Sequence, residues 1–97
     1  MNYRAARVDE NHAAIVSALR EAGCSVQSLA LIGKGCPDLL VGYEKRNFLF
    51  EVKNPLQPPS KQRLTDDEKQ WIAQWCGDVR VVRTPFEALL MSGARRR

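Results

Sequence analysis

The sequence lacks the features that mark several common protein classes. It has one histidine and three cysteines, and no two cysteines form a CxxC pair, which argues against a structural zinc site. His12 has no serine, cysteine or aspartate partner in a recognisable motif, so triad chemistry is unsupported. No signal-peptide pattern and no apolar run of membrane-spanning length are present, so we expect an intracellular protein with reduced thiols, no membrane partner and a cytoplasmic location.

The length and composition indicate one folded domain. A chain of 97 residues has room for one core, which we expect within about residues 9–91, followed by a basic tail at 92–97. Hydrophobic residues make up 44% and charged residues 27%, which argues against disorder. The net charge of +4 suits a polyanionic partner such as DNA. The Arg95–Arg97 tail is either a phosphate contact or a solvated end.

Periodicity and capping signals predict seven elements. Helical spacing covers 9–22, a strand follows at 26–32, and a hairpin at 37–53 has a four-residue link at 44–47. After a stiff proline loop at 54–59, a capping box at Thr65 opens a helix that ends at Gly77. A strand at 78–83 and a helix at 85–91, with a second capping box at Thr84, complete the chain. The order α-β-β-β-α-β-α predicts a small α/β domain whose mixed four-stranded sheet is flanked by helices.

The hairpin carries charges on strands that are otherwise apolar. Pairing Tyr43 with Phe48 would place Asp38 opposite Lys53 and diagonal to Glu51, on the face away from the aromatic residues. Two converging carboxylates repel each other, and a divalent cation would relieve that repulsion. Oxygen ligands suit Mg²⁺ or Mn²⁺ rather than zinc, and Lys53 adds a positive charge for a water or a phosphate. The alternative is a solvated strand edge, on which Glu-x-Lys pairs are common.

Other polar and aromatic residues allow two interpretations each. Lys34, between two glycines, either contacts a phosphate or lies in a simple turn. Backbone contacts to DNA are plausible for three residues that precede a helix start, namely Ser60, Lys61 and Arg63. Trp71 and Trp75 share a helical face, for which we expect core packing rather than a base-stacking platform.

The spacing of these residues resembles that of a known nuclease superfamily. Asp38 after Pro37, followed thirteen residues later by Glu51-x-Lys53, is similar to the PD-(D/E)XK signature. A longer set of motifs resembles one family within this superfamily, the stand-alone VRR-NUC (virus-type replication-repair nuclease) domains of phages and bacteria. These motifs are Gly33 to Val41, Phe50 to Lys53, Ser60, and Leu64-Thr65-x-x-Glu68. This resemblance implies the PD-(D/E)XK, restriction-endonuclease-like αβββαβ core. A phage origin would make the location the host cytoplasm.

The resemblance also implies roles for individual residues. Asp38, Glu51 and the backbone carbonyl of Val52 would hold Mg²⁺ or Mn²⁺, and Lys53 would orient or activate the attacking water. Family members often add a polar residue on the first helix, where Asp9, Glu10, Asn11 and His12 compete. We favour Glu10 or Asn11, although solvated charges at a helix start explain the same residues. Many relatives have glutamine at the position of Glu68, where the capping box alone accounts for the glutamate.

Three functions are compatible with these patterns. The first is a metal-dependent endonuclease acting on structured or branched DNA, such as four-way junctions, in replication, recombination or repair, with no small-molecule cofactor. The alternative is a non-catalytic basic DNA-binding module, against which the complete Asp38, Glu51 and Lys53 set argues. A sequence-specific restriction enzyme ranks last because the chain has little room for base-reading insertions. By resemblance we also expect a homodimer, with the terminal helix (Phe86, Leu89, Leu90 and Met91) as one candidate contact.

Overall fold

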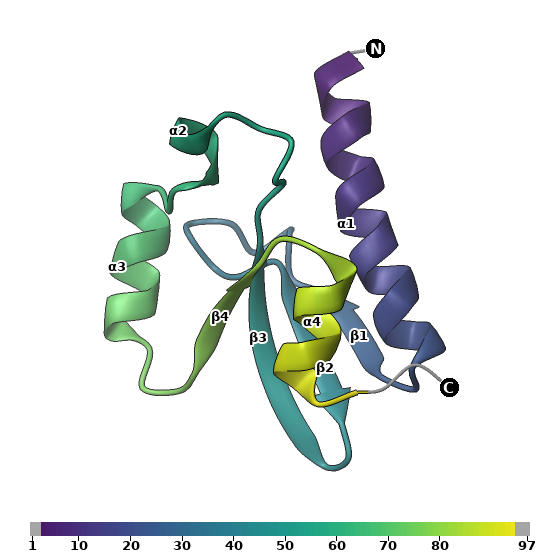
Figure 1. Ribbon diagram of the computed structural model, residues 1–97. Coiled ribbons are helices and arrows are strands. Elements are labelled where there is room, and N and C mark those ends of the chain that lie inside the picture. The colour runs from purple at the N-terminus through teal and green to yellow at the C-terminus, as the bar shows by residue number, and fades with distance from the viewer. Residues whose placement is uncertain (1–2, 95–97) are drawn as a thin grey trace.

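The computed structural model describes the backbone of residues 3–94 and the side chains of residues 10–94 (Figure 1). The expected tail at Arg95–Arg97 lies outside these residues. The predicted element order is confirmed, with one additional short helix, α2. The elements are α1 (Tyr3–Glu21), β1 (Ser25–Ser28), β2 (Leu39–Tyr43), β3 (Arg46–Val52), α2 (Pro59–Gln62), α3 (Asp66–Gln74), β4 (Val79–Val82) and α4 (Pro85–Ser92).

The four strands form one mixed sheet, as the sequence predicts. Their order is β1-β2-β3-β4, with antiparallel pairing of β1 to β2 and of β2 to β3, and parallel pairing of β3 to β4. Helices α1 and α4 pack together on one face (Figure 1). Helix α3, which leads into β4, borders the opposite face. Within residues 3–94 no helix is both long and apolar enough to cross a membrane.

Alternation along the strands separates the core from the charged residues. Leu39 and Val41 on β2 and Phe50 on β3 are fully buried with Ile15 and Leu19 of α1. Side chains at the intervening strand positions point to the other face of the sheet. Burial of these apolar side chains, worth about 1.5–3 kcal/mol each, therefore fixes which face every residue of the hairpin occupies.

The hairpin turn is tighter than the sequence suggested, so the predicted pairing of Tyr43 with Phe48 is wrong. Tyr43 pairs with Arg46, and the turn residues Glu44 and Lys45 have φ of 50° and 67°. Positive φ at both positions is what a type I′ turn requires, and this turn matches the twist of the two strands. The register differs from the prediction by two residues, and an even shift leaves every side chain on its predicted face.

Other boundaries also differ from the prediction. Helix α1 begins at Tyr3 rather than at Asp9, so the expectation that residues 9–12 lie at a helix start is wrong. After the predicted loop at 54–59, residues 59–62 form the short helix α2, which was not predicted.

The first strand ends at Ser28 rather than at residue 32, because the chain turns after the hydrogen bond from Leu29 N to Asp38 O (2.8 Å). The turn brings Gly35, at φ 85°, against the first turn of α3, where a Cβ atom would collide with the Asp67 carbonyl.

The capping signals are largely confirmed. At the start of α3, Thr65 Oγ1 accepts a hydrogen bond from Glu68 N, and Glu68 Oε1 accepts one from Thr65 N. Helix α3 ends at Gln74, three residues before the predicted Gly77. At α4, Thr84 Oγ1 accepts from Glu87 N, but the Glu87 carboxylate accepts from Arg83 N instead of closing the second box.

Candidate active site

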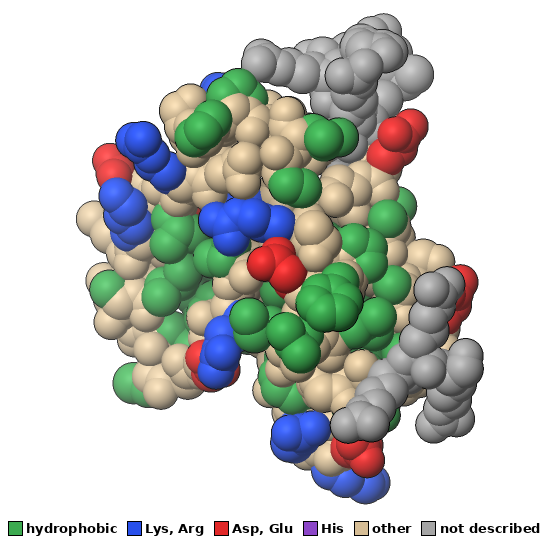
Figure 2. Space-filling model, viewed as in Figure 1, with side chains coloured by type: hydrophobic (Ala, Val, Ile, Leu, Met, Phe, Trp, Pro, Cys, Tyr) green, Lys and Arg blue, Asp and Glu red, His purple; other side chains and the backbone are tan. Residues whose placement is uncertain are grey.

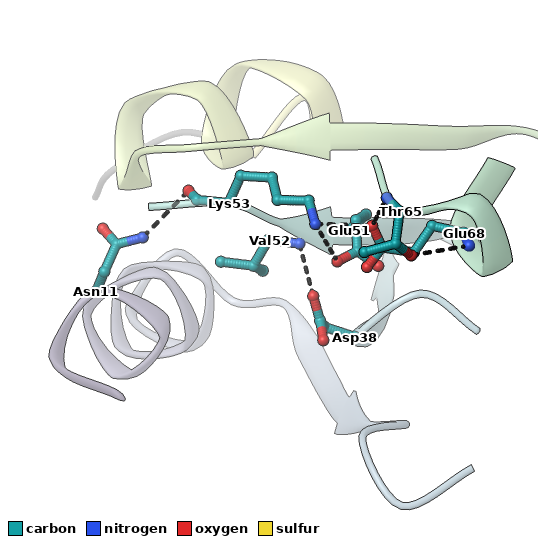
Figure 3. Close-up of polar contacts among 7 residues, drawn as sticks. All are labelled: Asn11, Asp38, Glu51, Val52, Lys53, Thr65 and Glu68. Carbon is teal, nitrogen blue, oxygen red and sulfur yellow. Dashed lines mark hydrogen bonds and ion pairs between the residues drawn. The ribbon is translucent and has the colours of Figure 1, made fainter. Parts of the chain in front are cut away.

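Asp38 and Glu51 lie together at one end of the hairpin. Leu39 is paired with Phe50, so continuing the register by one residue places Asp38 directly opposite Glu51, rather than diagonal to it. Asp38 Oδ2 accepts a hydrogen bond of 2.8 Å from Val52 N (Figure 3). This bond extends the contact of the two strands beyond the last paired residues and fixes the aspartate beside the glutamate.

Glu51 is buried among other acidic groups. Only 4% of the residue is exposed. Burial, hydrogen bonding with Asp38, and the charges of Asp38 and Glu68 raise the pKa of Glu51 to about 9. The protein therefore holds a proton in this cluster at neutral pH when no cation is bound.

Lys53 is held next to Glu51 by Glu68 of α3. Lys53 Nζ lies 2.7 Å from Glu68 Oε1 and 3.7 Å from Glu51 Oε2, and the Lys53 and Glu68 side chains are 11% and 15% exposed (Figure 3). Burial alone would raise the pKa of Glu68, but hydrogen bonds from Lys53 and from the Thr65 backbone bring it below its ordinary value. The interpretation that the capping box alone explains the glutamate at this position was therefore incomplete, because Glu68 also binds Lys53.

The first helix contributes an amide rather than a carboxylate. Asn11 Nδ2 donates a hydrogen bond of 3.4 Å to the backbone carbonyl of Lys53 (Figure 3). Glu10 is exposed, and His12 faces a separate groove between α1 and β1. The Asp9 side chain lies outside the described residues. Of the two favoured candidates, Asn11 contacts the site residues directly.

The donor set fits a hard divalent cation that keeps part of its water. Asp38 and Glu51 supply carboxylate oxygens in a cluster with excess negative charge. The N–H and C=O of a strand residue point toward the same neighbouring strand. The Val52 N–H binds Asp38, so the Val52 carbonyl also points toward the Asp38 side of β3. Among the side chains described, no group of three or more His, Cys, Asp or Glu could hold a metal ion. The residues thus fit Mg²⁺ or Mn²⁺ held by two carboxylates, a carbonyl and waters, not a closed cage of side chains.

The predicted DNA-contacting residues are exposed and occupy two separate segments. Ser60 and Lys61 lie on α2 and Arg63 follows it, while Lys34, with φ of 53°, lies in the loop that packs on α3. Figure 2 shows Lys and Arg side chains spread over the face on which α4 lies rather than gathered in one patch. The geometry is compatible with several separate phosphate contacts.

The prediction of core packing for the two tryptophans is wrong. Every residue of α3 is half-buried or exposed, and Trp75 is 49% exposed. The rings of Trp71 and Trp75 stack with centroids 4.6 Å apart. The sequence contains no signal for this exposure, because periodicity shows that α3 is amphipathic but does not show how closely it packs on the sheet.

Because the pKa of Glu51 is raised, replacing Glu51 with a neutral residue should stabilise the folded protein by an amount that depends on pH. Between its ordinary pKa of 4.5 and about 9, the folded protein holds a proton that the unfolded chain releases, so the free energy of unfolding falls as pH rises. In EDTA at pH 8, Glu51→Gln should melt at least about 4 °C above the unsubstituted protein, and near pH 4.5 the difference should largely vanish. Thermal melts followed by circular dichroism measure this, with the exposed Glu21→Gln as control. A lower Tm for Glu51→Gln at pH 8 would contradict the assignment.

Comparison of the chain with family models, with curated proteins and with solved structures finds no match.

Proposed function

We propose that this protein is a metal-dependent deoxyribonuclease that hydrolyses phosphodiester bonds, preferentially in branched DNA such as four-way junctions. One observation carries the proposal. Asp38 and Glu51 are adjacent on one face, with the Lys53 ammonium 3.7 Å from Glu51, and the carboxylates hold a proton when no cation is bound. Structural carboxylates are seldom crowded in this way, whereas sites for divalent cations require it.

The architecture supports the assignment to the PD-(D/E)XK superfamily. The helix, antiparallel three-stranded meander, helix and parallel fourth strand follow the order that the resemblance implies. The signature residues Asp38, Glu51 and Lys53 occupy the same face of the second and third strands or their ends. The narrower proposal of a stand-alone VRR-NUC type rests on the motif resemblance from Gly33 to Glu68.

Two carboxylates and one carbonyl are the proposed metal ligands. Asp38, Glu51 and the Val52 carbonyl oxygen would hold Mg²⁺ or Mn²⁺, and such an ion would supply a water of lowered pKa and offset negative charge on the phosphate. The Val52 N–H keeps Asp38 turned toward Glu51, so the chain brings both ligands together before any cation arrives.

Lys53 provides the positive charge at the reacting phosphate. Its side chain is mostly buried, so its charge acts in a region with little water. Glu68, fixed by the Thr65 backbone, holds the ammonium beside Glu51, and Asn11 holds the Lys53 carbonyl. A phosphate oxygen that enters the site competes with Glu68 for this ammonium, which then stabilises the developing charge or orients the water.

Substitution of the three site residues tests the proposal. The unsubstituted protein should cut one or more of linear, flapped and four-way DNA with Mg²⁺ or Mn²⁺ and none in EDTA. Asp38→Asn and Glu51→Gln should abolish cleavage, and Lys53→Ala should slow single-turnover cleavage by about 100-fold or more with little change in metal affinity. All three should keep salt-sensitive DNA binding.

Glu21→Gln, an exposed carboxylate on α1, is the matched control and should cut normally. Near-normal cleavage by Asp38→Asn or Glu51→Gln would show that the site is wrong. Salt-sensitive DNA binding without cleavage under any of these conditions would instead identify a non-catalytic DNA-binding module.

We also propose that the protein acts as a two-fold dimer. One domain presents one site, while resolution of a four-way junction needs two symmetric cuts, which an isologous dimer supplies. The exposed face of α4 is the candidate contact, since Phe86 and Leu90 are 72% and 66% exposed, and Figure 2 shows hydrophobic side chains over this helix. Sedimentation at micromolar concentration should give twice the 11.0 kDa mass of the chain. A monomer that resolves junctions by paired nicks would contradict the dimer alone.

A further inference from the structure

An apolar groove of about 550 Å³ lies between α3 and the sheet face that carries Asp38 and Glu51. Leu40 and Leu49, which are paired across β2 and β3, form its floor. Trp71 and Trp75 form its wall on the α3 side. The groove is therefore built from the apolar part of the same strand face that carries the site.

The groove lies beside the candidate active site along β3, because Leu49 lines the groove and Glu51 follows it by two residues. Leu49, Glu51 and Lys53 alternate along one face of the strand, so Leu49 precedes Glu51 by roughly 7 Å. Cys36 also lines the groove. Asp38 follows Cys36 by two residues in the chain, so this end of the groove lies near the carboxylates. A molecule in the groove thus lies next to a phosphate held at the carboxylates.

The tryptophans give the groove a flat aromatic surface. Their rings are stacked at 20° to each other, and Trp75 is half exposed. Gly77 lets the indole of Trp75 lie against the backbone, because a Cβ atom at this position would be 2.8 Å from Trp75 Nε1. Two polar residues, Asn47 and Asp78, also line the groove. The Asp78 carboxylate is bound by Arg80, so the Asn47 amide is the group that can bond the edge of a ring.

We propose that this groove binds an unpaired nucleobase of the DNA strand whose phosphate enters the carboxylate site. This inference rests on the proposed nuclease function and specifies its substrate as DNA with a single-stranded stretch beside the scissile phosphate. Bases in a duplex have both faces covered by stacking, so only an unpaired or extruded base can lie against an indole. The roughly 7 Å between Leu49 and Glu51 is also close to the length of one extended nucleotide.

The combination of lining residues favours a small flat ligand over a protein surface. Sites for such ligands are concave and mostly apolar, with a few polar groups that set orientation, a part that the Asn47 amide can take here. Two of its lining residues, Leu49 and Cys36, also lie two residues from Glu51 and Asp38 in the chain. A second copy of the chain seated in the groove is one of the outcomes that the experiment distinguishes.

Intrinsic fluorescence can report directly on the groove, because Trp71 and Trp75 are the only two tryptophans in the chain. The protein is titrated in EDTA, which prevents cutting, with three probes: single-stranded oligo-dT of about 12 nucleotides, an abasic oligonucleotide of equal phosphate number, and a blunt duplex. Oligo-dT should quench the fluorescence and, by the anisotropy of end-labelled strands, bind about 5- to 100-fold more tightly than the abasic strand. The abasic strand and the duplex should leave the emission nearly unchanged.

Substitutions at Trp75 separate stacking from charge. Trp75→Ala should lower the affinity for oligo-dT to that of the abasic strand and leave abasic binding unchanged. Trp75→Phe, which keeps a flat ring, should retain most of the affinity and shows that the position tolerates substitution. Leu56→Ala, which removes a side chain that is 82% exposed and outside the groove, should bind all three probes normally.

Equal binding of oligo-dT and the abasic strand without quenching would overturn the groove assignment. Metal-dependent cleavage by that same preparation would leave the nuclease proposal standing, so the two failures are distinguishable. A halved sedimentation mass for Trp75→Ala would also overturn it, because the groove would then be a contact between copies of the chain.

Discussion

The hydrogen bond from the Val52 amide to the Asp38 carboxylate joins the start of β2 to the end of β3, and the arrangement of every charged group around it depends on this bond. This hydrogen bond continues the contact between β2 and β3 beyond Leu39 and Phe50, the last paired residues of the two strands. Asp38 thereby lies opposite Glu51, in a region from which most water is excluded. The crowding of the carboxylates follows from their backbone positions rather than from flexible side chains, so the site is preorganised.

The Lys53 ammonium offsets part of this negative charge, and two neighbouring helices position Lys53. Helix α3 presents Glu68, whose carboxylate binds both the Thr65 amide and the Lys53 ammonium. One oxygen atom therefore starts the helix and positions the lysine. Helix α1 adds the Asn11 amide on the far side of Lys53. The sheet thus supplies the reactive groups, and the two helices hold the lysine in place.

The faces of the strands could be predicted from the sequence, and the turn could not. Apolar alternation assigns Phe50 to the core and Glu51 to the opposite face, whichever partner each residue has. The link at 44–47 has no Asn-Gly or Asp-Gly pair to announce a two-residue turn, so its length was misjudged. Since the error was an even number of residues, the site remained on one face.

The long-range contacts of the site were beyond what local pattern reveals. The Lys53–Glu68 pair and the Asn11–Lys53 bond join residues 15 and 42 positions apart, and only the packing of the helices brings them together. The exposure of Trp75 has the same origin, because α3 borders the sheet along one narrow stripe instead of covering it. Sequence periodicity shows that a helix is amphipathic but does not show how closely it packs.

The central claim is that Asp38 and Glu51 form a divalent-cation site that holds a proton until the cation binds. Isothermal titration with Mn²⁺, repeated in buffers of different ionisation enthalpy, tests it most directly because it reads binding and proton release together. At pH 7.5 we expect one Mn²⁺ per chain with release of about one proton, and an affinity that weakens by up to about tenfold for each pH unit below the Glu51 pKa of about 9. Absence of Mn²⁺ binding, or the same proton release from Glu51→Gln, would contradict the account.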